Sequence, residues 1–267
     1  MGAKVTTSFK LQQTRTIFFL AYLCDMTMEN SVLAIDAGNT SIKVGHFQKD
    51  HLIEVKRFLH SELDQFFSFI EHFINTPSIL SSVVSNQLTA EIISRTNANL
   101  VNADTPTPVT IEYETQNTLG IDRLCNAVAI VSRLDSEFGV VIDIGTCIKF
   151  DLITKEGLYK GGSISPGIDL RYKALNDYTG KLPKLSNKSN TNLVGDTTAS
   201  SIQSGVINGI NAEINGLMDM YSMQFESLTF FMTGGDASCF DILSKNDIFA
   251  DENLTLIGLF EIYKYNA

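Results

Sequence analysis

Two stretches of the sequence, residues 31–47 and residues 138–152, repeat one pattern of residue types. In each, an apolar run ends in an aspartate (Asp36 or Asp143), passes through a small-residue turn with a glycine and a threonine, and continues as a second apolar-rich run. The pattern predicts a strand, a tight turn and a returning strand, with a carboxylate at the bend. Backbone N–H groups in such a turn can face an anion, and a carboxylate is a ligand for a hard cation. The pattern therefore indicates an anion-binding turn beside a candidate metal ligand.

One copy alone has a simpler interpretation, because an aspartate can cap its own turn in an ordinary hairpin. The glycine and asparagine at positions 38 and 39 tolerate the positive φ that such turns require. Short motifs also arise by chance. Two copies in one chain weaken the simple interpretation and predict two related halves whose turns face each other.

The composition limits the class of function. The chain has 267 residues, of which 44% are hydrophobic and 19% charged, and this suits one large domain or two modest ones. The formal net charge of −10 argues against a nucleic-acid-binding surface, which needs clustered Lys and Arg. The sequence contains no apolar run of about 20 residues, so no membrane span is predicted. It also lacks the G-x-x-x-x-G-K-[ST] motif of P-loop nucleotide-binding proteins.

The cysteines and histidines are not spaced as metal ligands. The four cysteines lie far apart without C-x-x-C spacing, and the four histidines show no paired spacing. We therefore expect neither a zinc site nor a disulfide framework. This use of cysteine fits a reducing cytoplasm.

The spacing of apolar residues predicts the elements that position these groups. We expect short strands over Ile79–Val84 and Leu228–Met232, and helices over Ser61–Ile74, Ala90–Thr96, Leu124–Leu134, Ile168–Leu175, Thr198–Met220 and Leu254–Tyr265. Residues 106–120 are expected as a loop or an edge strand, and residues 179–192 as a polar surface loop. The glycine-rich stretch 157–167 suits either a close approach of the backbone to a ligand or a plain turn. The helix over 198–220 has an apolar stripe that suits either an internal core or a dimer seam: Ile202, Val206, Ile210, Ile214 and Leu217.

Residues 1–30 precede the first strand and form an N-terminal extension. They contain three basic residues followed by an apolar run, Ile17–Cys24, that is too short to span a bilayer. This arrangement partly matches a signal peptide, but no small-residue cleavage site follows. We favour the alternative that translation starts at Met26 or Met28.

Six motifs in order give the chain a family resemblance. They are Asp36–Thr40 with Lys43, Gly120–Arg123, Asp143–Thr146, Gly161–Gly167, Gly195–Thr198 running into Ser201–Gly205, and Thr233–Ala237. The first resembles the phosphate-binding loop of the acetate and sugar kinase, heat-shock protein and actin superfamily, and the set is similar to type III pantothenate kinase. The resemblance implies an α/β fold of two RNase H-like (actin-like ATPase) domains, residues 31–134 and 135–267, around a central cleft.

The same resemblance implies ATP-dependent phosphorylation of pantothenate to 4'-phosphopantothenate, the first step of coenzyme A biosynthesis. Asp122 matches the general base of the family. The pantothenate pocket is matched by Tyr113, Gly120, Ile121 and Arg123, with Thr198 reaching the pocket of the other subunit of a homodimer. The ATP site is matched by Asp36, Gly38, Asn39, Thr40, Lys43, Thr146, Gly234 and Gly235. From the residues alone, the simpler explanation is that Asp122 caps the helix; the resemblance favours the functional role instead.

The resemblance also implies two cations. Asp36 matches a ligand of Mg²⁺, either directly or through water, and Asp143 matches the position used for potassium or ammonium. We therefore expect strict dependence on a divalent ion and strong dependence on K⁺ or NH₄⁺.

The chain departs from the family pattern at two places, and two other functions remain open. Cys147, Ile148 and Lys149 replace small hydroxylated residues, and Asp196 stands where a basic residue is common, which indicates weaker nucleotide affinity. The first alternative function is another small-alcohol kinase of the superfamily; the second is a non-enzymatic accessory transcription regulator. The missing basic patch argues against direct DNA contact.

Overall fold

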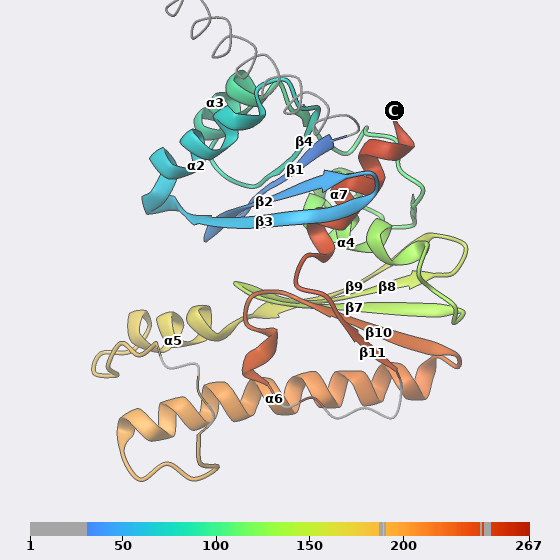
Figure 1. Cartoon of the computed structure of the whole chain (residues 1–267). Helices are drawn as coiled ribbons and strands as arrows, with labels where there is room; N and C mark the ends of the chain where they lie inside the picture. Colours follow the sequence, from blue (N-terminus) through green and yellow to red (C-terminus); the bar gives the residue numbers. More distant parts are fainter. Residues whose placement is uncertain (1–30, 187–188, 190, 241, 243–246) are drawn as a thin grey trace, which may run out of the picture.

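The computed structural model describes residues 31–186, 189, 191–240, 242 and 247–267. The N-terminal extension predicted over residues 1–30 lies outside the described residues, and so does the predicted translation start at Met26 or Met28. The described chain forms two β-sheets with helices between them and on their outer faces (Figure 1).

The first sheet has the strand order β3-β2-β1-β4-β5. β1 pairs antiparallel with β2 and parallel with β4, while β2 pairs antiparallel with β3 and β4 pairs parallel with β5. The strands are β1 (Ser31–Ala37), β2 (Ser41–Gln48), β3 (His51–Leu59), β4 (Ser78–Ser82) and β5 (Asn99–Leu100).

The second sheet repeats this topology with one strand added. Its order is β11-β10-β7-β8-β9-β6, and from β9 to β11 the parallel and antiparallel pairings match those from β3 to β5. The strands are β6 (Thr110–Ile111), β7 (Phe138–Ile144), β8 (Cys147–Thr154), β9 (Leu158–Pro166), β10 (Leu228–Thr233) and β11 (Ile248–Ala250). The predicted α/β fold with two RNase H-like halves is therefore confirmed.

The helices complete a layered arrangement (Figure 1). They are α2 (Leu63–Ile70), α3 (Asn86–Thr96), α4 (Ile121–Val131), α5 (Ile168–Asp177), α6 (Thr198–Gln224) and α7 (Leu254–Tyr265), with short 3₁₀ turns at His60–Glu62, Glu71–Phe73, Gln116–Thr118 and Ala237–Cys239. α2 and α3 cover the outer face of the first sheet, α4 and α7 lie between the sheets, and α5 and α6 cover the second sheet.

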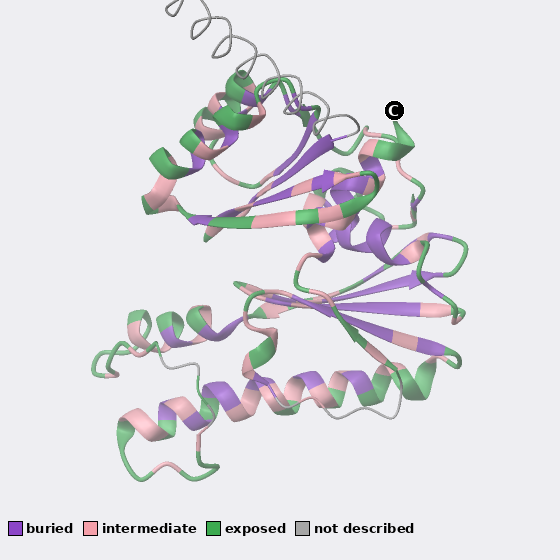
Figure 2. Cartoon of the chain, viewed as in Figure 1, coloured by how far each residue is buried: buried purple, intermediate pink, exposed green. Residues whose placement is uncertain are grey.

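Burial explains why the two central strands are apolar without alternation. In β1, Val32 and Ala34 join the core between the sheets, whereas Leu33 and Ile35 join the core under α2 and α3. A strand covered on both faces must be apolar at successive positions. Figure 2 shows this burial along the central strands of both sheets.

The long helix α6 is held by an internal core. Four of the five residues of its predicted stripe are buried with residues of the second sheet: Ile202, Val206, Ile210 and Ile214. Leu217 packs against the same cluster while partly buried. The stripe therefore forms part of the core, which decides between the two uses that the sequence left open.

Two features of the structure were not predicted from the sequence. The glycine-rich stretch 157–167, which the sequence left open as a ligand contact or a plain turn, is mostly β9, because its glycines let two strands approach closely: a Cβ on Gly162 would lie 1.7 Å from the carbonyl oxygen of Phe150 in β8. The C-terminal helix α7 returns to the first half of the chain, where it packs against β1, β4 and α4. The domain boundary between residues 134 and 135 remains a prediction.

Candidate functional site

The two Asp-x-Gly turns lie next to each other, as their repetition predicts. The hydroxyl oxygens of Thr40, after β1, and Thr146, after β7, are 3.2 Å apart. Both threonines lie at exposed turns that end strands at the centre of their sheets. The two halves therefore present their turn backbones to one shared region.

The Thr233–Ala237 turn joins the same region from β10. The N–H of Asp236 donates to the carbonyl oxygen of Ile144 in β7 at 3.0 Å. Gly234 has φ +98°, and a Cβ there would lie 2.2 Å from that carbonyl oxygen, so this position requires glycine. The double-glycine turn thus packs directly on the end of β7, beside the Asp143 turn.

Asp36 is a partly buried carboxylate near the end of β1. Burial, together with the negative charges of Asp122 and Asp143, raises its pKa to about 6, against weaker opposing contributions from Lys43 and Ser81. These causes show that the three carboxylates lie close enough to repel one another. Asp36 carries a charge that its surroundings do not fully compensate, which suits a cation ligand.

Lys149 of β8 forms an ion pair with two of these carboxylates. Its Nζ lies 2.6 Å from Oδ2 of Asp122 and 2.7 Å from Oδ2 of Asp143. Asp143 is its direct cross-strand partner in the β7–β8 pair. Burial lowers the pKa of Lys149, but the two carboxylates outweigh burial and raise the pKa above its ordinary value. The Lys149 side chain is 14% exposed and remains charged.

Asp122 lies in the first turn of α4 and does not cap it. The N-cap residue is Gly120, without a side-chain cap, so Asp122 does not occupy the N-cap position that the simpler interpretation expects. Oδ1 of Asp122 accepts the N–H of Arg123 at 2.9 Å. A Cβ on Gly120 would lie 2.5 Å from that Oδ1, so glycine gives the carboxylate its place over the helix start.

Arg123 is buried and paired. Its Nε and Nη2 donate to Oδ1 of Asp151 at 2.9 and 2.5 Å, and the hydroxyl of Tyr159 donates to the same oxygen at 2.6 Å. The guanidinium carbon lies 6.0 Å from the centre of the Tyr113 ring and 5.8 Å from that of Tyr159. Burial raises the pKa of Asp151, while Arg123 opposes this shift. The structure thus brings Tyr113, Gly120, Ile121, Asp122 and Arg123 together at the start of α4.

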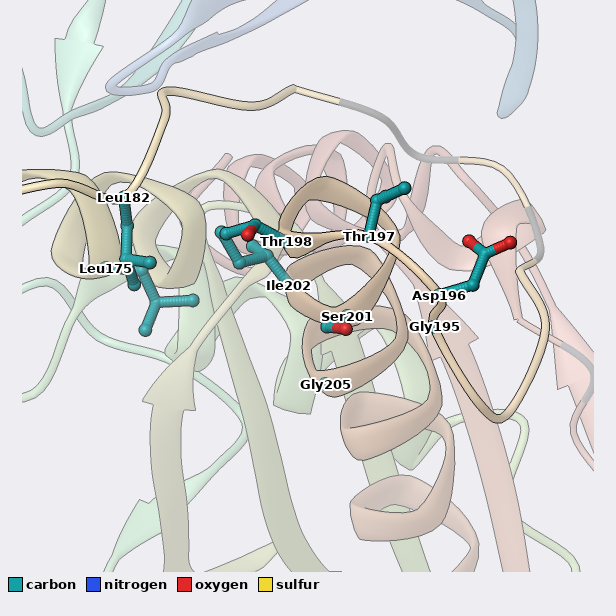
Figure 3. A pocket seen from close by; sticks show the side chains of 9 residues that line it. All are labelled: Leu175, Leu182, Gly195, Asp196, Thr197, Thr198, Ser201, Ile202 and Gly205. Atoms are coloured by element: carbon teal, nitrogen blue, oxygen red, sulfur yellow. The ribbon is translucent and has the colours of Figure 1, made fainter.

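Two predicted site residues, Lys43 and Thr198, make their contacts away from the start of α4 and the facing turns. Lys43 donates its Nζ to the carbonyl oxygen of Glu252 at 2.8 Å, and so ties β2 to the segment before α7. Thr198 begins α6 and lines a hollow of 620 Å³ between α5 and α6 (Figure 3). The residues that line this hollow include neither Tyr113 nor Arg123. Asn39 is exposed at the first turn.

The structure also shows residues that sequence reasoning missed. Nε of Arg57 in β3 donates to Oγ of Ser41 at 2.9 Å, and its guanidinium lies 3.6 Å from where a Cβ of Gly235 would be. A ring nitrogen of His60 lies 3.0 Å from the carbonyl oxygen of Gly38. Among these missed residues, Asp151 alone had a sequence signal, as a carboxylate between the apolar residues Phe150 and Leu152. Arg57 and His60 had none, because their contacts are with distant segments.

No compact cluster of protein ligands for a metal is formed by the described residues. Among them, no three His, Cys, Asp or Glu side chains group closely enough to hold an ion. A divalent ion at Asp36 would then take its remaining ligands from waters and phosphate oxygens, as is usual for Mg²⁺. Within the same described ranges, no helix is long and apolar enough to span a membrane.

Comparisons with known proteins agree with this arrangement. A protein-family model described as type III pantothenate kinase matches residues 32–220. The type III pantothenate kinase of Christiangramia forsetii is 40% identical over 244 residues, which cover 88% of this chain and 98% of the relative. That of Phocaeicola vulgatus is 39% identical over 238 residues, with the same two coverages.

A solved structure from Campylobacter jejuni shares the fold. It is described as a conserved putative Baf family transcriptional activator and superposes with a TM-score of 0.59. Its sequence is 24% identical, and the match covers 88% of this chain and 98% of that protein. At this identity the likeness concerns the fold alone.

Proposed function

Because the chain belongs to the type III pantothenate kinase family, we propose that it transfers the γ-phosphoryl group of ATP to the hydroxyl of pantothenate. The observation that carries the proposal is the meeting of two Asp-x-Gly turns, 3.2 Å apart at their threonine hydroxyls, beside the helix start that holds Asp122. Phosphoryl transfer depends mainly on positioning and charge neutralisation, and this arrangement supplies both.

ATP binds across the two turns and the double-glycine turn. The backbone from Gly38 to Thr40 and the hydroxyl of Thr146 hold the phosphates, and the surface of Gly234 and Gly235 takes the nucleoside. Gly234 lets the turn pack on the backbone of Ile144, and a Cβ on Gly235 would have only the guanidinium of Arg57 within 4 Å, so this turn presents a surface without side chains of its own. Asn39 and Lys43 belong to the proposed ATP site, although Lys43 must leave the carbonyl of Glu252 to reach a phosphate.

Pantothenate binds at the start of α4. Tyr113, Gly120, Ile121 and Arg123 line this end of the site, and two of the five N–H donors of Arg123 are used by Asp151. The remaining donors suit a carboxylate substrate. Thr198 lies on a separate hollow, so its proposed part in substrate binding requires a second subunit, which is why a homodimer is included in the proposal.

Asp122 is the proposed general base. Its Oδ1 accepts one N–H and its Oδ2 accepts one ammonium hydrogen, but a carboxylate has about four acceptor positions. The substrate hydroxyl can therefore donate to Asp122 while both observed contacts persist. Such a base contributes about 10²–10⁴ to the rate.

The residues fit one of the two predicted cations better than the other. A divalent ion held at Asp36, directly or through water, fits the uncompensated charge there and would neutralise the phosphates when bound. At Asp143 the carboxylate is already paired with Lys149, so a free potassium or ammonium ion has no vacant negative charge to neutralise. The requirement for K⁺ or NH₄⁺ remains a prediction that this geometry does not favour. A cytoplasmic location completes the proposal, since the use of cysteine fits a reducing compartment.

A coupled assay of ADP release tests the proposed function, with Mg²⁺, ATP and pantothenate as reactants. We expect ADP release that requires pantothenate and stops when Mg²⁺ is chelated. Release that is the same without pantothenate would point to another acceptor alcohol, and a panel of sugars and small alcohols would identify its class. A folded protein with no ADP release under any condition would favour the non-enzymatic regulator.

A further inference from the structure

We propose that the ammonium group of Lys149 serves as a built-in monovalent cation between Asp122 and Asp143, so that turnover is independent of potassium and ammonium ions. The inference deepens the proposed function and rests on it, because the turnover that it concerns is the proposed kinase reaction. It concerns a residue that lies outside the six motifs.

The geometry places the ammonium group where a free cation would have to bind. Nζ of Lys149 is 2.6 Å from Asp122 and 2.7 Å from Asp143, so both carboxylates already hold a positive charge in direct contact. A second cation on Asp143 would lie against this ammonium group and be repelled by it. The carboxylates are only 31% and 14% exposed, which limits screening by water and salt.

The local fold holds the lysine in this place. Lys149 and Asp143 are directly paired across the β7–β8 hairpin, and α4, which carries Asp122, packs against β8. Neighbours of Lys149 in β8, Ile148 and Phe150, are each 1% exposed and anchor the strand in its core. The positive charge of Lys149 is therefore present at every turnover without an ion binding from solution.

The charge balance of the region agrees with this role. Asp36, Asp122 and Asp143 bring three negative charges, and Lys149 brings one positive charge into contact with two of them. A divalent ion at Asp36 balances the remaining two. Lys43, which faces Asp36 across the first hairpin, instead donates to a backbone carbonyl. ATP can then approach without a further free cation.

The test compares turnover in potassium, ammonium, sodium and choline chloride, each with Mg²⁺ at constant ionic strength. We expect wild-type kcat to vary by less than about twofold, and Lys149→Met to lose about 10²–10³ in choline, as when a preorganised charge is removed. Potassium or ammonium should restore the variant at least about tenfold, by refilling the vacated position. Lys155→Met, an exposed lysine six residues along whose Nζ bonds the backbone of Asp135, is the matched control and should behave as wild type. A wild-type rate that falls tenfold or more in choline overturns the inference.

A second readout separates this inference from the proposed function. Thermal midpoints are measured in potassium and in choline, without substrates. An ion that binds only the folded variant should raise the midpoint of Lys149→Met in potassium by about 2 °C or more and leave wild type unchanged. A potassium-dependent rise in wild type, or none in the variant, contradicts the inference even if the enzyme proves to use another acceptor. Lys149→Arg, which keeps the charge, should show no potassium effect and so excludes a general loss of fold.

Discussion

The β1–β2 hairpin and the β7–β8 hairpin start from the same Asp-x-Gly pattern, and each has a lysine directly opposite its aspartate. In the first, Lys43 donates to the carbonyl of Glu252, and Asp36 keeps a pKa raised to about 6. In the second, Lys149 lies 2.7 Å from Asp143. One motif thus produces a carboxylate that still needs a cation and another that already has one.

The neighbours of each hairpin explain this difference. α4 packs against β8 and brings Asp122 within 2.6 Å of Lys149, so two carboxylates hold the lysine over the turn. The β2 lysine instead meets the segment before α7, which offers a backbone carbonyl. A divalent ion is consequently expected at the first hairpin, and the phosphoryl acceptor beside the second.

The largest expected effect comes from removing the base beside the second hairpin. Asp122→Asn should lower kcat by about 10²–10⁴ with a much smaller change in the KM for pantothenate, because the amide cannot accept the hydroxyl proton. Steady-state assays measure both constants. Asp64→Asn, an exposed aspartate in the first turn of α2, is the control and should stay near wild type. A loss confined to KM would assign Asp122 to binding instead.

The two opposed lysines should differ in stability. Lys149→Met leaves Asp122 and Asp143 without their counter-charge in a partly buried site, and should lower the free energy of unfolding by about 2 kcal/mol or more. Lys43→Met removes one hydrogen bond to a carbonyl and should cost about 1 kcal/mol. Urea unfolding of the ligand-free proteins measures both values. Equal losses would remove the distinction between the hairpins.

The first hairpin should respond to pH in the absence of Mg²⁺. Since the pKa of Asp36 rises from 3.8 to about 6 on folding, the folded state binds this proton more tightly than the unfolded state. Its stabilising contribution is therefore complete below about pH 4 and is lost as pH rises through about 6. Asp36→Asn should be more stable than wild type by up to about 3 kcal/mol above pH 6, with no difference near pH 4.

Denaturant unfolding at several pH values tests this sign. A variant that is less stable than wild type at pH 7 would show that Asp36 has a counter-charge after all. The same variant should lose Mg²⁺-dependent turnover, so that stability and activity change in opposite directions.

The smallest expected effect comes from removing the direct contact between the two hairpins. The Thr40 and Thr146 hydroxyls are exposed, so a double-mutant cycle with Thr40→Val and Thr146→Val should give a coupling energy of about 0.5 kcal/mol or less without nucleotide. Saturating ATP should increase this coupling if both hydroxyls bind the phosphates. An unchanged coupling would place the nucleotide away from one turn.

The amino-acid sequence by itself determined the repeated strand–turn–strand units, the approximate positions of the long helices and the family. These features depend on the local periodicity of apolar residues and on the short-range conformational preferences of glycine and aspartate. The predicted boundaries of α5, α6 and α7 lie within a few residues of the observed ones. Strand β9 over 158–166 was not predicted from the sequence, because close pairing of β9 with β8 outweighs the turn preference of its glycines.

Only the tertiary structure decided which charges meet. Lys149 is 27 residues from Asp122, and Arg123 is 28 residues from Asp151, so no local pattern could pair them. The same holds for Lys43, whose partner lies 209 residues away. Charge pairing falls off over a few ångströms in space and takes no account of separation along the chain. The sequence therefore specified two alike hairpins, and the packing of α4 and of the segment before α7 made them electrostatically different.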